Sequence, residues 1–186
     1  SILEIMSGDD IDSRKFDLLM EQIFELPEDA HMIVDNGASS FVPLGSYLAE
    51  NSALTLMLEN EHKVFLHTIL TGGQAIGDTL QGLNSLANTF DAPIVVWLNQ
   101  YFGEIAVNGK SFESFKVYKD NIDKFHAIIE IPHGKQSTFG KDLESIFAQR
   151  ISLETAISSP RPIMERQRIK KWWGDAVSVM DQANFV

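Results

Sequence analysis

Four short runs of apolar residues recur along the chain, and each is rich in β-branched residues and ends in polar or turn-forming residues. The runs are nearly continuous rather than alternating, which is typical of strands that are buried on both faces of a sheet. We therefore expect four strands in a mainly parallel sheet. The runs are Met32–Val34, Val64–Leu70, Ile94–Leu98 and Ala127–Ile131.

Between these runs, apolar residues recur every three or four positions, as on one side of an amphipathic helix. Ser13 precedes the first such pattern and is a candidate N-cap. The second pattern is interrupted near Asn51 and predicts either one helix or two short ones. The predicted helical segments are Ser13–Leu26, Val42–Leu58, Ile76–Phe90, Phe139–Arg150 and Ile163–Ala183.

The alternation of strands and helices predicts the fold class. Strand starts recur at roughly 30 residues, the length of a βαβ unit. This spacing favours a three-layer α/β domain whose parallel sheet, of four or more strands, has helices on both faces. We expect a single domain over residues 1–186 with a C-terminal helix over 163–186. The segment Glu104–Phe112 departs from the pattern, since Asn108-Gly109 between β-prone arms predicts a small hairpin.

Composition narrows the function classes. The 186 residues include no Cys, which excludes disulfides and thiolate metal sites. The net charge of −11 argues against direct nucleic-acid binding by the chain as a whole. The apolar runs fall short of the ~20 residues that a membrane span needs. No charged-then-apolar leader is present, so we expect no transmembrane segment and a cytoplasmic location.

Polar side chains follow the apolar runs at the edge where a doubly wound sheet binds its ligands. After the first run, Asp35 could hold a Mg²⁺ ion through water beside a nucleotide. Gly37 would let the backbone pass close to a phosphate. A type I′ hairpin turn at Asn36-Gly37 is about equally compatible with the spacing, although the following segment is a poor strand.

The second and third runs end in weaker signals. Thr71 begins a turn with two glycines that leads into a helix, whose N-terminus could attract an anion. Asn99 ends a strand, and its amide could read a purine edge. For each residue taken alone, a structural role is the favoured interpretation: a strand-to-helix loop for Thr71, and a hydrogen bond to its own turn for Asn99.

Other chemistry-bearing residues do not form a catalytic pattern. The five histidines have no metal-ligand spacing, and His67 and His126 lie within predicted strands. A basic cluster from Arg166 to Lys171, followed by Trp172-Trp173, could be a docking helix. We favour a solvated face with tryptophans packed on the domain. A phosphate-binding loop of the form Gly-x-x-x-x-Gly-Lys-Ser/Thr is absent from the sequence.

Several segments together resemble a known family, the TraL-type conjugal transfer proteins of plasmids. More broadly, the order of strand ends resembles the second half of the ParA/MinD-type deviant P-loop ATPases. The resemblance extends over nearly the whole chain, and DNGASSFVPL is its most specific part. The segments are MIVDNGASSFVPLGSYL, HTILTGGQA, VVWLNQYFG, GKSFESFKVY and PIMERQRIK.

The resemblance implies roles for individual residues. Asp35 takes the Walker B position, Asn99 takes the place of the base-contacting asparagine, and Ile131-Pro132 flanks the base. Members of the ParA/MinD family begin with a strand, a lysine-bearing glycine loop, a helix and a second strand, which would lie upstream of Ser1. We thus expect ATP and Mg²⁺ to bind the full-length protein, and neither to bind this chain tightly.

Two functional interpretations follow, and a third is weaker. The first is an ATPase-related component of plasmid conjugation, truncated here, that forms a homodimer and works with conjugation or type IV secretion proteins. The second is a non-enzymatic adaptor that keeps the fold and binds a partner through Val42–Asn60 or Ile163–Ala183. A small-molecule phosphotransferase using Asp35 is the third, and no substrate motif supports it.

Overall fold

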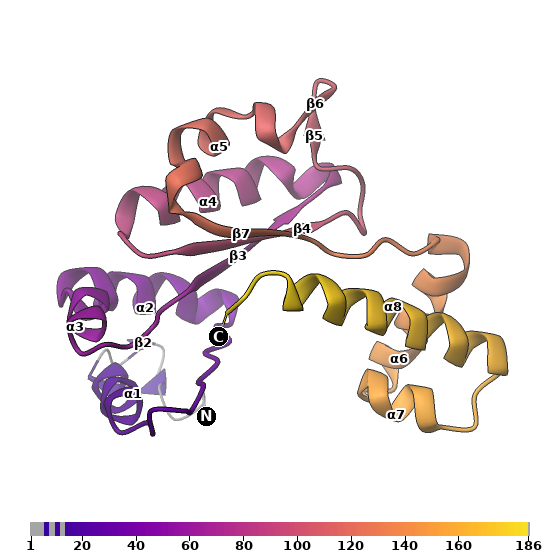
Figure 1. Ribbon diagram of the computed structural model, residues 1–186, viewed down its shortest axis with the longest axis horizontal. Helices are drawn as coiled ribbons and strands as arrows, with labels where there is room; N and C mark the ends of the chain where they lie inside the picture. Colours follow the sequence, from indigo (N-terminus) through magenta and orange to yellow (C-terminus); the bar gives the residue numbers. More distant parts are fainter. Residues whose placement is uncertain (1–5, 8–9, 12–13, 186) are drawn as a thin grey trace. The chain divides into compact units, whose positions relative to one another are not determined.

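The chain divides into two compact units, Ser1–Val64 and Phe65–Val186. The structure is a computed structural model, and it describes residues 6–7, 10–11 and 14–185 (Figure 1). The single domain expected over residues 1–186 stays a prediction.

The first unit is mostly helical. A short antiparallel pair joins β1 (Met6–Ser7) to β2 (Asp10–Ile11). Three helices follow: α1 (Lys15–Phe24), α2 (Ala38–Glu50) and α3 (Ala53–Glu59). The break near Asn51 is confirmed, because Ser52 has a φ of 50° and begins a new helix. The N-cap predicted at Ser13 lies outside the described residues.

The first predicted strand is wrong. Residues 31–37 form an irregular segment that leads into α2. Its apolar residues are not buried, and 92% of Ile33 is exposed. The run Met32–Val34 has only three apolar residues between polar neighbours, which is too little apolar surface to fix a strand inside a sheet.

The second unit contains the parallel sheet. Its three strands are β3 (Leu66–Thr71), β4 (Ile94–Asn99) and β7 (Phe125–Glu130), in the order β3-β4-β7. Both pairings are parallel, as predicted. The crossover between the first two strands is α4 (Ile76–Thr89), entered through a short 3₁₀ turn at Gly73–Ala75. The three longer apolar runs therefore became strands and the shortest did not.

One face of the sheet is covered by α4 and by α5 (Lys116–Asn121), as Figure 1 shows. The core on this face includes Leu70, Leu83, Ile94 and Val96, each fully buried. Single-turn 3₁₀ segments at Phe112–Ser114 and Ile122–Lys124 flank α5. Burial of this kind is the main contribution to stability in a domain of this size.

The other face is covered by the C-terminal end of α8 (Ile163–Asp181). Val95 and Ile129 of the sheet pack there with Val179 and Ala183. With helices on both faces, this unit has the three layers that were predicted. The C-terminal helix ends at Asp181, earlier than the predicted 163–186 range, and residues 182–185 continue as a non-helical tail.

The remaining elements complete the second unit. The predicted hairpin is confirmed as β5 (Ala106–Val107) and β6 (Lys110–Ser111), with positive φ at both Asn108 and Gly109 as a type I′ turn requires. A π-helical turn at Gln136–Gly140 precedes α6 (Lys141–Ala148), and α7 (Leu153–Ser158) packs with α8.

Candidate functional site

Three of the predicted site residues share one edge of the sheet. Thr71 ends β3 and Asn99 ends β4, and the two are direct partners in the strand register. Pro132 follows β7 by two residues, next to Ile131, whose N–H donates to Leu98 O (3.0 Å). The carboxyl ends of the three strands thus bring these positions together, which is where an open α/β sheet binds ligands.

The turn after Thr71 is fixed by close packing of two loops. The Thr71 N–H donates to Thr79 Oγ1 of α4 (3.2 Å). A Cβ at Gly72 would lie 1.9 Å from the carbonyl oxygen of Gly103, and Gly73 has a φ of 72°. The glycine pair is therefore required by the loop that follows β4, which passes directly over this turn.

Asn99 has one half of its amide engaged. Its Oδ1 accepts from the Tyr101 N–H (3.0 Å), and its backbone carbonyl accepts from the Gly72 N–H (3.1 Å). The first bond is the local turn contact that sequence reasoning favoured. The Nδ2 group makes no hydrogen bond to any residue described by the structure, so the side chain is held in one orientation with its donor free.

Pro132 is tied to the last helix. Its carbonyl accepts from the indole Nε1 of Trp172 (2.6 Å), whose ring stacks on Phe139 at 5.3 Å. The predicted packing of the tryptophans on the domain is confirmed for Trp172. In the neighbouring basic cluster, Arg168 donates to both carboxylate oxygens of Asp142 (2.6 and 3.0 Å). That cluster therefore holds α8 to α6 rather than presenting only free charges.

A cavity of about 350 Å³ opens beside this edge, between the strand ends and the β5–β6 hairpin. Leu98, Ile105 and Phe112 contribute apolar surface to it. Glu104, Glu113 and Glu130 also line it, and neither Lys nor Arg is found among its described lining residues. The hydrogen bond from the Ser111 hydroxyl (2.6 Å) lowers the pKa of Glu113. Such a lining repels phosphate and suits a cationic or polar group.

Sequence reasoning missed this cavity. Its carboxylates are spread over 27 positions and meet only because the hairpin folds back over the strand ends. The only sequence signal was the hairpin itself.

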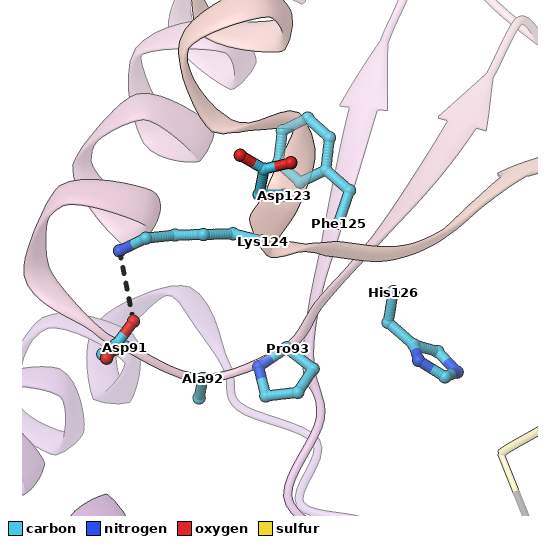
Figure 2. A pocket seen from close by; sticks show the side chains of 7 residues that line it. All are labelled: Asp91, Ala92, Pro93, Asp123, Lys124, Phe125 and His126. Atoms are coloured by element: carbon cyan, nitrogen blue, oxygen red, sulfur yellow. Dashed lines mark ion pairs between the residues drawn. The ribbon is translucent and has the colours of Figure 1, made fainter.

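A second cavity, of about 320 Å³, lies at the opposite edge of the sheet (Figure 2). Its most prominent group is Lys124, which pairs with Asp91 (3.7 Å) and donates to the carbonyls of Ala87 (2.9 Å) and Phe90 (3.1 Å). These carbonyls belong to the end of α4, so Lys124 acts as a C-terminal cap of that helix. Its ammonium is already occupied by these partners.

The other predicted residues belong to the first unit. Asp35, Asn36 and Gly37 are exposed and precede α2. Gly37 is the N-cap of that helix, and its carbonyl accepts from the Ser40 N–H (3.0 Å) and from Ser40 Oγ (3.1 Å). Asp35 therefore does not end a buried strand, although its predicted role as a Mg²⁺-holding residue stays a prediction.

Comparison with known proteins identifies the family. Two Escherichia coli proteins named TraL are 44% and 45% identical to the chain over 171 residues. Each match includes 90% of this chain and 70% of the relative. The chain belongs to the TraL family. No family model matches the chain, and no solved structure matches it.

Two further observations concern this TraL-family chain. Among residues 6–7, 10–11 and 14–185, the structure has no group of three His, Asp or Glu residues that could hold a metal ion. Of the helices in the same part of the chain, none combines the length and the apolar character that crossing a membrane requires.

Proposed function

We propose that the chain acts in plasmid conjugal transfer as a cytoplasmic component related to the ParA/MinD ATPases, and that its full-length form depends on a nucleotide. One observation carries this proposal: Thr71, Asn99 and Pro132 lie at the same carboxyl edge of a parallel three-stranded sheet. Nucleotides bind at this edge in open α/β sheets. The TraL relatives supply the link to conjugation.

In this proposal the second unit provides the base side of the nucleotide site. Asn99 would donate its free Nδ2 to the base, beside Pro132, and its orientation is already fixed by the Tyr101 N–H. Thr71 would bind the nucleotide on its phosphate side. In the full-length protein Asp35 would hold a Mg²⁺ ion through water, and Asn36 and Gly37 would be nucleotide-binding residues. By the resemblance to ParA-like proteins, bound Mg-ATP would drive dimerisation.

The phosphate side is the part that this chain does not provide. A phosphate cradle requires a lysine and a row of loop amides, and the sequence holds no such loop. The cavity beside the strand ends is lined by carboxylates. We therefore propose that the chain alone binds neither ATP nor Mg²⁺ tightly, and that the full-length protein forms a homodimer and contacts conjugation or type IV secretion proteins.

The test measures nucleotide binding in two proteins. Calorimetry with Mg-ATP on full-length E. coli TraL should give binding, and this chain should give none at the same concentration. NMR titration of the chain with adenosine at high concentration should shift resonances at Asn99 and Ile131. The Asn99→Ala variant should lose these shifts, whereas Asn88→Ala, on the exposed side of α4, should keep them. Shifts elsewhere only, or none, would contradict the base site.

A second candidate is a non-enzymatic adaptor. It is favoured by the exposed apolar residues on α2 and at the start of α8, among them Val42, Ile163 and Met164. Apolar side chains exposed on neighbouring positions are typical of protein-binding surfaces. If neither the chain nor full-length TraL binds Mg-ATP, the adaptor replaces the nucleotide-dependent component as the proposed function.

A further inference from the structure

Five rings gather on the second face of the sheet, the face covered by the end of α8. The tail places Phe185 against His67, with ring centroids 5.4 Å apart, and against Phe65 at 5.7 Å. His126 lies 4.6 Å from Phe65 and 6.1 Å from Phe185, and Trp97 stacks beside His67 at 6.0 Å. The C-terminal tail is thus held to the sheet chiefly by aromatic contacts.

Two hydrogen bonds define the protonation state of this cluster. Trp97 Nε1–H donates to Nδ1 of His67 (3.0 Å), so that nitrogen carries a lone pair and the proton of the neutral ring is on Nε2. His126 Nε2 lies 2.9 Å from the carbonyl oxygen of Ala183 and donates to it. A second proton on His67 would bind to Nδ1, and this N–H would then point at the N–H of Trp97. A second proton on His126 leaves its bond to Ala183 intact.

We propose that the tail Gln182–Phe185 is a latch on this face of the sheet, closed while His67 is neutral and released when His67 takes up a proton. Protonation at Nδ1 breaks the bond from Trp97 and turns the His67 ring. Phe185 then loses a contact surface, and the rings of Phe65 and Trp97 become accessible. The latch does not rest on nucleotide binding, because it uses none of Thr71, Asn99 and Pro132.

The surroundings of His67 set the direction of the switch. Burial is the first cause that lowers the pKa of His67, and the charge of His126 is the second. The sheet residues on the same face (Phe65, Ile69, Val95 and Trp97) carry no charge. The tail carries none between Gln182 and Phe185, and Asp181, which ends α8, is exposed and forms no ion pair with a described residue.

Without a counter-ion, the imidazolium is disfavoured in the closed state and favoured after release. The latch therefore opens as the pH falls below the ordinary histidine range.

The test follows Phe185 directly. The full chain with 4-fluorophenylalanine at position 185 is examined by ¹⁹F NMR between pH ~5 and ~8, the range over which histidine changes charge. The Phe185 resonance should move from a half-buried to a solvent-exposed position as the pH falls. In His67→Asn, whose Oδ1 still accepts from Trp97 but does not titrate, the resonance should keep its half-buried position. The same label at Phe147, which is exposed on α6, should not move.

Two results would overturn the latch: a Phe185 resonance that does not change with pH, or an equal change in His67→Asn. Trp97→Phe gives an independent check if His67→Asn fails to fold, as judged by circular dichroism. Without the opposing N–H, a second proton on His67 no longer turns the ring, so the Phe185 resonance of this variant should not move with pH. A movement as large as that of the wild type would also contradict the proposal.

Discussion

The two faces of the sheet in the second unit are built on different principles. On strand β3, Leu70 points to the α4 face and is fully buried, while its neighbour Ile69 points to the α8 face and is 53% exposed. On the first face the side chains that pack together are mainly apolar. The second combines apolar residues with two histidines and a tryptophan: Trp97 donates to His67, and His126 donates to the carbonyl of Ala183. A closely covered apolar face provides stability, whereas a face that is only partly covered and includes polar groups can change state.

The difference arises from how much helix covers each face. On the first face α4 lies along the strands with Leu83, Leu86 and Ala87 buried against them. On the second face only the end of α8 reaches the sheet, because the earlier part of that helix packs on α6 and α7 through Ile169. The non-helical tail supplies the rest of the cover.

The largest expected effect comes from comparing substitutions of two adjacent residues of β3 that point to opposite faces of the sheet. Leu70→Ala should lower the free energy of unfolding by ~3 kcal/mol, because it leaves a cavity in a core that cannot close around it. Ile69→Ala, one residue along the same strand, should cost less than ~1 kcal/mol, since much of its side chain is already in water. Urea unfolding measures both. Equal losses would show that the second face is as tightly packed as the first.

How much of this contrast is predictable from the sequence depends on how far apart along the chain the contacting residues are. The runs around Leu70, Val96 and Ile129 predicted three parallel strands, because a long apolar run has few alternatives to burial. The run Met32–Val34 failed because three apolar residues fit an exposed segment equally well. The hairpin at Asn108-Gly109 was predictable because its turn chemistry is local.

The candidate site was predictable only in part. Parallel strands place their ends at one edge, so the grouping of Thr71, Asn99 and Pro132 followed from the strand predictions. The contact of Gly72 with Gly103 and the bond from His126 to Ala183 join residues 31 and 57 positions apart. No local pattern specifies such pairs, because each depends on how two loops or a tail pack after the strands have formed.

A second prediction concerns the anchor that holds α8 near the second face. Trp172→Phe removes the donor to the Pro132 carbonyl and part of the stacking on Phe139. We expect a loss of ~2 kcal/mol in the free energy of unfolding. The matched control is Trp173→Phe, since Trp173 is half-buried and forms no hydrogen bond to a described residue; it should cost ~1 kcal/mol or less. A larger loss in the control would mean that the hydrogen bond is not the anchor.

A third prediction tests the strand end on the α4 side. Thr79→Val keeps the shape of the side chain but leaves the Thr71 N–H without its acceptor. The expected loss is ~1 kcal/mol, the usual cost of an unmade hydrogen bond at a half-buried group. Amide exchange at Thr71 should accelerate at the same time. Thr89→Val makes the same chemical change on the exposed end of α4 and should alter neither quantity.

The smallest effect is the pH dependence of stability that His67 contributes. Its folded-state pKa lies below the ordinary value of 6.5, so between the two values the unfolded chain binds more protons than the folded chain. The free energy of unfolding therefore rises as the pH rises through this window, and it decreases as the pH falls through it.

Thermal unfolding of the wild type and of His67→Asn should give curves that converge at high pH and separate below it, with the wild type less stable. Because His67 is partly exposed, the separation should be smaller than the losses expected for Leu70→Ala, Trp172→Phe and Thr79→Val. Curves that remain parallel at all pH values would mean that the second face does not respond to the charge of His67, and the contrast between the two faces would then be one of packing alone.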